Sequence, residues 1–309
     1  MSFTYINPGN VNLLDIQNGT TVENSKYNPY SGVSFWQSDS DGGIKLSEIP
    51  TEIYAKMTVA IRSDVSESAN ARMFVGNSNG WTIRESYGAW YLDITCGNSQ
   101  IKSLKGAESN LNFNGLNDIL LHAKAGYYEE GLISITVNGH EVFTANRTVK
   151  FVKDSSYATE SDFVILYCKN EKTLMSNIII SDSAVECKEQ VAVLPVTEMD
   201  SDMSANDDGS YSATAAGQHL FQKVDAASLI SMYGGLSKVT GLYIIGNPAY
   251  RTGSEITEAI ACTRRDGMVE EIGKAKLSME NTAKALIGGK VSMTLDEMNG
   301  YEFGWKAGV

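Results

Sequence analysis

The sequence predicts a mainly β protein with two domains: a jelly-roll β-sandwich, followed by a smaller β-rich domain with short helices. Three observations predict this class. Apolar and polar residues alternate with period two through the first half of the chain, helical spacing hardly appears there, and loops rich in Asn, Ser, Gly and Asp separate the alternating runs. Roughly ten short strands connected in this way are typical of a sandwich, and nothing indicates a parallel α/β fold.

The clearest strand covers residues 53–61, where Ile53, Ala55 and Met57 alternate with more polar neighbours, so we expect one buried face. A hairpin is predicted over residues 132–144, because Asn138-Gly139 separates two alternating runs and suits a type I′ turn. The other strands predicted in this half are residues 11–16, 33–36, 73–75, 89–95, 119–124, 163–167 and 175–181. These segments assign residues 1–184 to the sandwich.

A change of composition near residue 190 predicts the domain boundary. Acidic and turn-prone residues from Glu198 to Gly209 follow a run that ends at Pro195, so residues 185–200 are predicted to be a linker and residues 201–309 the second domain. Strands are predicted there at residues 211–215, 239–245, 257–263 and 301–306.

Two short helices are predicted in the second domain. Asp225 can cap one helix that ends at Gly234, and the spacing Thr294-Leu-Asp-Glu297 is that of a capping box for the other. Residues 276–287 fit a helix or a strand, and both alternatives stay open.

The composition excludes several classes of protein. Lys and Arg number 25 and Asp and Glu 37, which gives a net charge of −12 and disfavours nucleic acid and anionic membranes as partners. The apolar runs, such as residues 178–180, are far shorter than the roughly 18 residues of a membrane helix, so no membrane insertion is expected. The first residues carry neither a basic segment nor a long apolar stretch, so we expect no secretory signal and folding in a reducing compartment.

No catalytic residue and no resident cofactor are predicted. Cys96, Cys168, Cys187 and Cys262 lack the C-x-x-C spacing of a zinc site and do not form a disulfide framework. The three histidines, His122, His140 and His219, are read as structural or solvent-facing residues. Glu198, Asp200 and Asp202 have the spacing of acids on one strand face, but their turn-rich surroundings favour a solvated loop over a glycosidase pair.

Calcium is the one metal for which the sequence offers ligands. Asp39 and Asp41 lie two residues apart before a glycine turn, and Asp207-Asp208-Gly209 is a weaker second case. Neither sequence completes an EF-hand loop, so a polar turn is the default interpretation and a calcium site at Asp39 and Asp41 is the alternative.

Four aromatic residues are candidates for carbohydrate binding because they are expected near strand ends and loops. They are Trp36, Trp81, Tyr87 and Trp90. Sandwich cores usually bury their tryptophans, so the default places most of these side chains in the core, and the alternative places one or two in a glycan groove.

The first domain resembles the concanavalin A-like, laminin G-like jelly-roll superfamily. Leu120-Leu-His-Ala-Lys124 followed by Ile133-Ser-Ile-Thr-Val-Asn-Gly139 is similar to its antiparallel strand pair, and Met175-Ser-Asn-Ile-Ile-Ile-Ser-Asp182 is similar to its closing strand. The resemblance implies the fold of residues 1–184 and carries over no binding site.

The second domain resembles C-terminal β-domains of phage structural proteins. The similar segments are residues 209–214, 217–222, 239–242 and 294–306. This resemblance implies a virion component, such as a tail, baseplate or head-surface protein, synthesised in the cytoplasm of the bacterial host. It also implies a homo-oligomer whose partners are other virion proteins. A host-surface glycan is a further candidate partner, which the resemblance does not imply.

The leading hypothesis is therefore a non-enzymatic phage structural protein that is displayed on the virion and contacts host glycans. A bacterial lectin-like carbohydrate-binding module is the first alternative, and a glycoside hydrolase is the second. Fold alone does not decide among them.

Overall fold

The computed structural model describes residues 4–8, 19–22, 35–37, 41–44, 50–63, 70–76, 78–97, 99–151, 164–169, 172–194, 196–245, 251–279 and 286–309. The chain divides into two compact units, Met1–Val193 and Leu194–Val309. In the described residues the paired strands are antiparallel, and the α-helices are the short α1 (Ala227–Tyr233) and α2 (Leu295–Met298). The predicted mainly β class is confirmed. Neither helix approaches the length and apolar character needed to cross a membrane.

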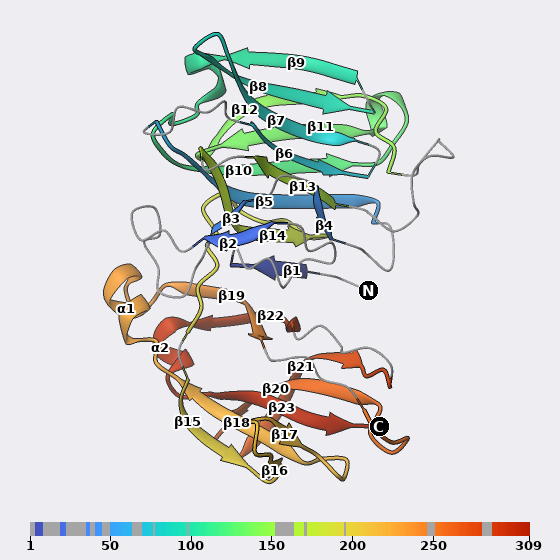
Figure 1. Cartoon of the computed structure of the whole chain (residues 1–309), viewed down its shortest axis with the longest axis vertical. Helices are drawn as coiled ribbons and strands as arrows, with labels where there is room; N and C mark the ends of the chain where they lie inside the picture. Colours follow the sequence, from blue (N-terminus) through green and yellow to red (C-terminus); the bar gives the residue numbers. More distant parts are fainter. Residues whose placement is uncertain are drawn as a thin grey trace. The chain divides into compact units, whose positions relative to one another are not determined.

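The first unit consists of two antiparallel sheets (Figure 1). The eight-stranded sheet has the order β12 (His140–Asn146), β11 (Leu132–Val137), β10 (Gly115–Lys124), β5 (Glu52–Ile61), β14 (Thr173–Ser181), β3 (Phe35–Gln37) and β2 (Thr20–Val22), and β1 (Thr4–Asn7) also pairs with β14. The six-stranded sheet has the order β4 (Gly42–Ile44), β13 (Val164–Lys169), β6 (Asn70–Val75), β7 (Asn79–Ser86), β8 (Ala89–Cys96) and β9 (Ser99–Lys105).

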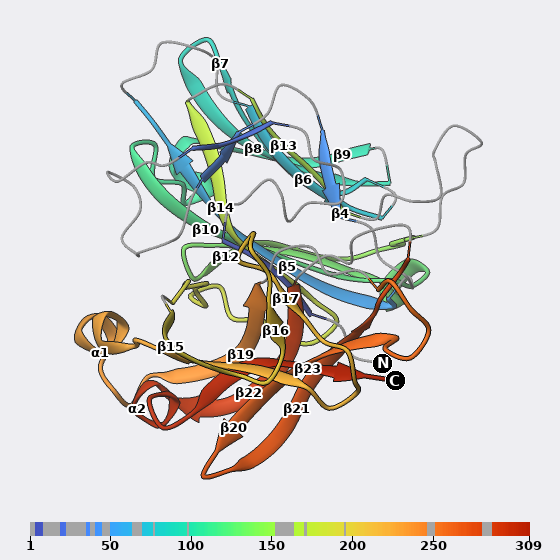
Figure 2. The same ribbon diagram turned by 60° about the horizontal axis from the view of Figure 1, so that its bottom comes forward.

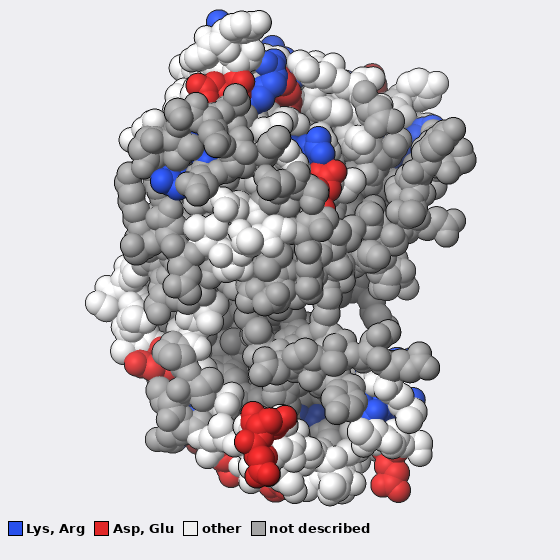
Figure 3. Space-filling view, viewed as in Figure 1, with Lys and Arg blue, Asp and Glu red and all other residues white. Residues whose placement is uncertain are grey.

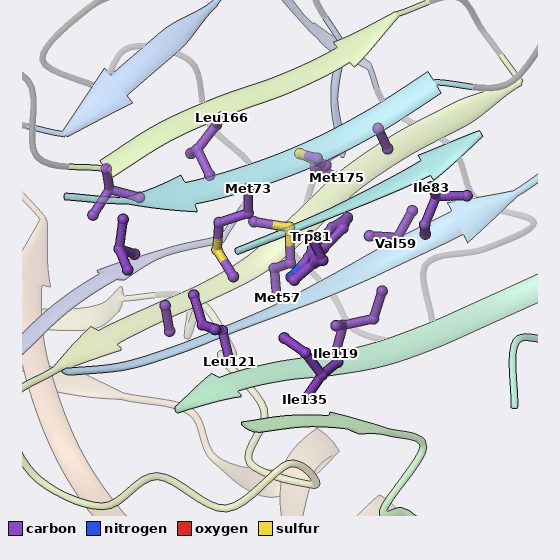
Figure 4. Packing of buried hydrophobic residues seen from close by; sticks show 14 of the residues in the cluster. Met57, Val59, Met73, Trp81, Ile83, Ile119, Leu121, Ile135, Leu166 and Met175 are labelled. Carbon is purple, nitrogen blue, oxygen red and sulfur yellow. The ribbon is translucent and has the colours of Figure 1, made fainter. Parts of the chain in front are cut away.

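The core of this unit lies between the two sheets. Ile53, Ala55 and Met57 of β5 are fully buried, as their alternation predicts, and they pack with side chains from the other sheet. Figure 4 shows Trp81 of β7 lying close to Met57, within a cluster to which both sheets contribute. This packing makes the first unit a β-sandwich.

The predicted hairpin is confirmed in detail. It consists of β11 and β12, and the turn residues Asn138 and Gly139 have φ values of 51° and 80°. Asn and Gly tolerate these positive φ angles better than other residues, which is why this pair specifies the turn.

The segment 182–193 packs on the outer face of the eight-stranded sheet. Val185 and Val191 are buried against Ile179, and the half-buried Tyr54 and Leu120 contact the same cluster. The predicted linker 185–200 is thus divided: its first part packs on the first unit, and Val196–Ser201 forms strand β15 of the second. The chain near Glu198 is a strand and not the turn-rich loop that its composition suggested.

The second unit has a five-stranded sheet, a two-stranded ribbon and a small hairpin (Figures 1 and 2). The sheet order is β15, β18 (His219–Val224), β23 (Glu302–Gly308), β20 (Glu258–Arg265) and β21 (Met268–Lys276). The ribbon pairs β19 (Lys238–Ile245) with β22 (Leu286–Thr294), and the hairpin pairs β16 (Ser204–Ala205) with β17 (Tyr211–Ser212).

Glycines allow the sheet and the ribbon of this unit to approach each other closely. A Cβ atom on Gly273 of β21 would lie 2.4 Å from the carbonyl oxygen of Gly288 in β22, so no larger residue fits without a backbone shift. This contact connects β21 to the ribbon through backbone packing.

Both predicted helices are present, with one difference at a cap. The N-cap of α1 is Ala226, although the Asp225 carboxylate accepts a hydrogen bond from the Ala227 N–H at 2.9 Å. In α2 the capping box of Thr294 and Glu297 is formed as predicted. The segment 276–287 is neither one helix nor one strand, because β21 ends at Lys276 and β22 begins at Leu286.

The predicted strands agree unevenly with those observed. Residues 211–215 are a strand only at Tyr211–Ser212, and residues 11–16 lie outside the described part of the chain. The strands that were not predicted are β1, β2, β4, β7, β9, β15, β16, β18, β21 and β22.

Candidate functional site

The outer face of the six-stranded sheet carries the most distinctive group of polar side chains in the first unit. In β6, Ala71, Met73 and Val75 are buried in the sandwich, so the alternate residues point outward. The same alternation in β7, β8, β9 and β13 fixes which residues share this face.

The strand register brings these residues together in two rows. One row crosses the sheet through Tyr167, Arg72, Thr82, Asp93 and Ser103. The next row crosses through Asn70, Arg84, Tyr91 and Lys105. We call these nine residues and Phe74 the arginine–tyrosine face. Because neighbouring strands lie about 4.8 Å apart, each row places its side chains in lateral reach of one another.

Arg72 is held against aromatic rings. Its guanidinium carbon lies 4.7 Å from the ring centroid of Tyr167 and 5.9 Å from that of Phe74. Its Nη2 is 2.7 Å from Asp41 Oδ1, and its Nε has no hydrogen-bond partner among the described residues. The side chain is 35% exposed, so part of this guanidinium group faces solvent. Stacking fixes its plane at a modest energetic gain of about 0.5–1 kcal/mol at an exposed site.

Arg84 is held in the same manner on the other side of the face. Its guanidinium carbon lies 4.2 Å from the Tyr91 ring centroid, and the Lys105 amine lies 5.9 Å from the same centroid. Arg84 pairs with the Asp93 carboxylate, which is 8% exposed and also accepts a hydrogen bond from Ser103 Oγ at 2.5 Å. A buried carboxylate bound on two sides keeps the Arg84 guanidinium in one orientation.

This arrangement can recognise anions. An arginine presents N–H groups in a planar fork that matches a carboxylate, a sulfate or a phosphate. Because the tyrosines and carboxylates already restrain Arg72 and Arg84, a ligand that binds them loses less side-chain entropy than it would with free arginines. Figure 3 shows basic and acidic side chains lying next to one another on the first unit.

Two of the aromatic residues predicted from sequence are core residues. Trp36 is 1% exposed and Trp81 is 0% exposed, and both belong to the central cluster between the sheets. A ring without accessible surface cannot stack on a sugar, so the carbohydrate-binding interpretation of Trp36 and Trp81 is wrong, and their default interpretation holds. Their strands direct both side chains inward because their alternate neighbours face out.

Trp90 and Tyr87 lie near the turn between β7 and β8, apart from the arginine–tyrosine face. Trp90 is half-buried and stacks on Phe113 with a centroid separation of 5.4 Å, and the Lys172 amine lies 5.5 Å from its ring centroid. Tyr87 is fully exposed and has a φ of 51°. Carbohydrate contact by these two residues stays a prediction.

The calcium candidate is only partly described. Asp41 is exposed and pairs with Arg72, whereas Asp39 lies outside the described residues. No group of three or more metal-ligating side chains occurs within the described ranges. Calcium at Asp39 and Asp41 therefore stays a prediction.

The acids at the start of the second unit are engaged in ion pairs. Asp200 Oδ2 lies 2.6 Å from Arg264 Nη2, and this hydrogen bond holds the pKa of Asp200 below its ordinary value. Arg264 also pairs with Glu302, while Asp202 pairs with His219 at 3.3 Å. These bonds stabilise pairing between strands, which is a structural role for Asp200 and Asp202.

His122 also has structural partners. Its Nε2 lies 2.7 Å from Glu52 Oε1, and its ring stacks on Tyr54 at 4.2 Å with an interplanar angle of 9°. The hydrogen bond from His122 is the main cause of the lowered pKa of Glu52. The described residues thus satisfy His122 by stacking and pairing on the outer face of the eight-stranded sheet.

The arginine–tyrosine face was not among the predicted sites, although the sequence contains a signal for it. The segments 70–75, 79–86 and 89–96 all alternate, and their polar positions include Arg72, Arg84 and Tyr91. The same alternation that predicts the buried residues of these strands also predicts that these polar side chains point outward. Tyr167 is added by strand pairing, which the sequence does not specify.

No protein family and no curated protein matches the sequence. Among solved structures, the chain is similar to an endo-β-1,4-glucuronan lyase from the fungus Trichoderma reesei, with 14% identity and a TM-score of 0.41 over 60% of this chain and 98% of that one. It is also similar to the carbohydrate-binding module CBM66 from Bacillus subtilis, with 16% identity and a TM-score of 0.31 over 52% and 88% of the two chains. Sheep galectin-11 matches with 8% identity and a TM-score of 0.30 over 46% and 95%. These likenesses are distant.

Proposed function

We propose that the chain is a non-enzymatic carbohydrate-binding protein whose arginine–tyrosine face binds a glycan that carries acidic groups. The observation that carries this proposal is the pair of guanidinium groups, Arg72 and Arg84, stacked on Tyr167 and Tyr91 on one open sheet face.

The geometry favours an acidic glycan over a neutral one. The guanidinium groups lie over the rings of Tyr91 and Tyr167, so a sugar that stacked on that side of these rings would have to displace them. A carboxylate or sulfate can instead bind the outer edges of the guanidinium groups while the stacking stays intact. The exposed amine of Lys105 adds one further cationic contact on the same face.

The absence of catalysis is part of the proposal and has its own support. Among the described residues of this face there is no histidine, and the carboxylate of Asp93 is bound by Arg84 and Ser103. A general base has to reach the substrate, and the Asp93 side chain is only 8% exposed. The proposal therefore expects binding without cleavage.

The experiment compares binding to acidic and neutral polysaccharides by affinity electrophoresis and calorimetry. Wild-type protein should bind a polyuronate and not an uncharged glucan, and binding should weaken as salt is added. Arg72→Met and Arg84→Met should each reduce affinity by about tenfold or more, which corresponds to about 1.4 kcal/mol. Lys102→Met is the matched control, because it removes one exposed positive charge from β9 outside the arginine–tyrosine face.

Three results would contradict this proposal. Equal binding of neutral and acidic chains would remove the role of charge. An equal loss in Lys102→Met would show that only net charge matters. Release of shortened chains from a bound polyuronate, abolished by Arg84→Met, would instead establish an enzyme.

We further propose that the chain is displayed in several copies on a phage particle, where it contacts the host surface. The support is the resemblance of residues 209–214 and 294–306 to phage structural proteins. Several copies would let weak single contacts add up to firm attachment. Light scattering should show a multimer at micromolar concentration, and mass spectrometry should detect the chain in purified particles. A monomer that binds glycan and is missing from particles would favour the bacterial module instead.

A further inference from the structure

A cluster of five polar side chains, three buried and two half-buried, lies on the outer face of the eight-stranded sheet where the segment 182–193 covers it. Its members are Lys56 and Thr58 of β5, Asp118 of β10, Asn177 of β14 and Gln190 of the covering segment. The Lys56 side chain is 0% exposed and Asn177 is 3% exposed. An amine enclosed in this way is costly to keep charged, so its presence calls for a chemical reason.

The amine of Lys56 and the carboxamide of Asn177 meet at one hydroxyl group. Lys56 Nζ lies 3.1 Å from Thr58 Oγ1, and Asn177 Nδ2 donates to the same Oγ1 at 3.0 Å. Asp118 Oδ1 lies 2.8 Å from Lys56 Nζ and accepts a hydrogen bond from Thr58 Oγ1 at 2.6 Å. A nucleophile, an acyl group and a carboxylate are therefore gathered around Thr58.

A strand irregularity places Asn177 in this cluster. The register of β14 against β5 shifts between Ser176 and Ile179, and Asn177 has a φ of 54°. A bulge redirects a side chain that regular alternation would turn toward the other face, and such irregularities often accompany functional positions. Here the bulge gives the Asn177 amide access to Thr58 and, through it, to Lys56.

The surroundings activate both reacting groups. The backbone N–H of Val191 donates to Asn177 Oδ1, where negative charge would develop if a nucleophile added to the carboxamide carbon. Burial lowers the pKa of Lys56, because desolvation disfavours the ammonium form more than Asp118 favours it. The neutral amine is the nucleophilic form of lysine.

We propose that Lys56 and Asn177 join in an intramolecular isopeptide bond, with Asp118 as the catalytic residue. Nζ of the neutral amine attacks Cγ of Asn177, a new Nζ–Cγ bond forms, and the Cγ–Nδ2 bond breaks. As Nζ attacks, the Asp118 carboxylate accepts the proton that Nζ releases and transfers it to the departing nitrogen, which leaves as ammonia, so Asp118 ends as a carboxylate again. The reaction oxidises and reduces nothing.

The reacting groups start from positions on either side of one hydroxyl, because Nζ lies 3.1 Å and Nδ2 3.0 Å from Thr58 Oγ1. Reacting atoms must approach to about 3–3.5 Å, so the lysine chain has to move past the Thr58 hydroxyl toward Asn177 Cγ. The product bond would connect neighbouring strands β5 and β14 across the 120 residues that lie between positions 56 and 177. A cross-link over so long a loop restricts the unfolded chain and stabilises the first unit.

The test is the intact mass of the purified, denatured full-length chain, followed by peptide mapping. The mass should be lower than the sequence mass by one ammonia, and a branched peptide should connect Lys56 to Asn177. Lys56→Met, Asn177→Ala and Asp118→Asn should each have the full sequence mass. Asn177→Asp should lose water instead of ammonia and reach the same final mass as the cross-linked wild type.

Peptide mapping separates this reaction from another way to lose ammonia. An Asn-Gly pair can lose ammonia by closing a ring with its own backbone, and the chain has five such pairs, at 18–19, 79–80, 114–115, 138–139 and 299–300. The branched peptide that contains Lys56 and Asn177, which ring closure does not produce, therefore identifies the isopeptide bond as the cause of the deficit. A wild-type chain with the full sequence mass would overturn the proposal. So would separate unbranched peptides containing Lys56 and Asn177. Both readouts use wild-type protein, so they decide the question even if a variant fails to fold.

Discussion

Replacement of Trp81 tests whether this residue belongs to the core, as the structure has it, or to a ligand site, as its aromatic character suggested. Trp81 is 0% exposed, and its indole N–H has no hydrogen-bond partner among the described residues. Trp81→Ala and Trp81→Phe therefore separate two physical effects, the loss of packing and the removal of a buried, unsatisfied donor.

The expected magnitudes differ strongly between the two variants. Trp81→Ala opens a large cavity and should reduce the free energy of unfolding by about 3–5 kcal/mol. Aromatic side chains bury about 150–250 Å², so replacing Trp81 by the smaller Phe removes at most about 100 Å² of buried surface. This loss lowers the free energy of unfolding by up to about 2.5 kcal/mol. The replacement also removes the unsatisfied N–H, which returns about 1–3 kcal/mol. We expect Trp81→Phe to lie within about 1.5 kcal/mol of wild type.

Urea unfolding monitored by circular dichroism measures both values, and affinity electrophoresis on a polyuronate monitors function. Trp81→Phe should bind like wild type, because the ring does not reach the arginine–tyrosine face. The reasoning is refuted if Trp81→Ala is as stable as wild type, or if Trp81→Phe unfolds normally but no longer binds.

Three further predictions concern the described contacts. Thr294→Ala removes the capping box of α2 and should destabilise the second unit by about 1 kcal/mol, whereas Thr294→Ser should retain most of the stability in urea unfolding. Gly273→Ala should destabilise that unit by about 1–3 kcal/mol, because its Cβ would lie 2.4 Å from the Gly288 carbonyl oxygen. Gly253→Ala is the control, since a Cβ there would have nothing within 4 Å. Equal losses of stability in the two variants would contradict the packing argument. The hydrogen bond with His122 is the main reason why the pKa of Glu52 in the folded protein is below its ordinary value of 4.5. The ionised Glu52 therefore stabilises the fold above pH 4.5, and this stabilisation is lost as the pH falls through the pKa of Glu52 in the folded protein. In His122→Ala the urea midpoint should therefore fall less between pH 7 and pH 3 than it does in the wild type. The same dependence of the midpoint on pH in both proteins would contradict a stabilising interaction between Glu52 and His122.

Local patterns were sufficient where one short segment contains all the information. Alternation in residues 53–61 predicted β5, and the Asn138-Gly139 pair predicted its turn. The capping spacing of Thr294 and Glu297 predicted α2. In each case the interactions that decide the structure lie within a few residues of one another, so propensity and periodicity reveal them.

The predicted linker was wrong where the local composition indicated a loop but the segment pairs with a remote strand. Residues 196–201 contain acidic residues and looked like a linker, yet they form β15 because β18 lies beside them and Arg264 pairs with Asp200. Propensity for strand is weak and depends on such neighbours, which a reading of the local sequence does not include.

The sequence by itself determined that this chain is mainly β, where several strands lie and which turns connect them, because side chains that alternate along a strand must separate water from core. Only the tertiary structure decided which strands are neighbours. Pairing of β13 with β6 brings Tyr167 to Arg72, and the bulge in β14 brings Asn177 to Thr58, although each pair is distant in sequence. Contacts of this kind depend on register between remote segments, and register is fixed by packing of the whole sandwich.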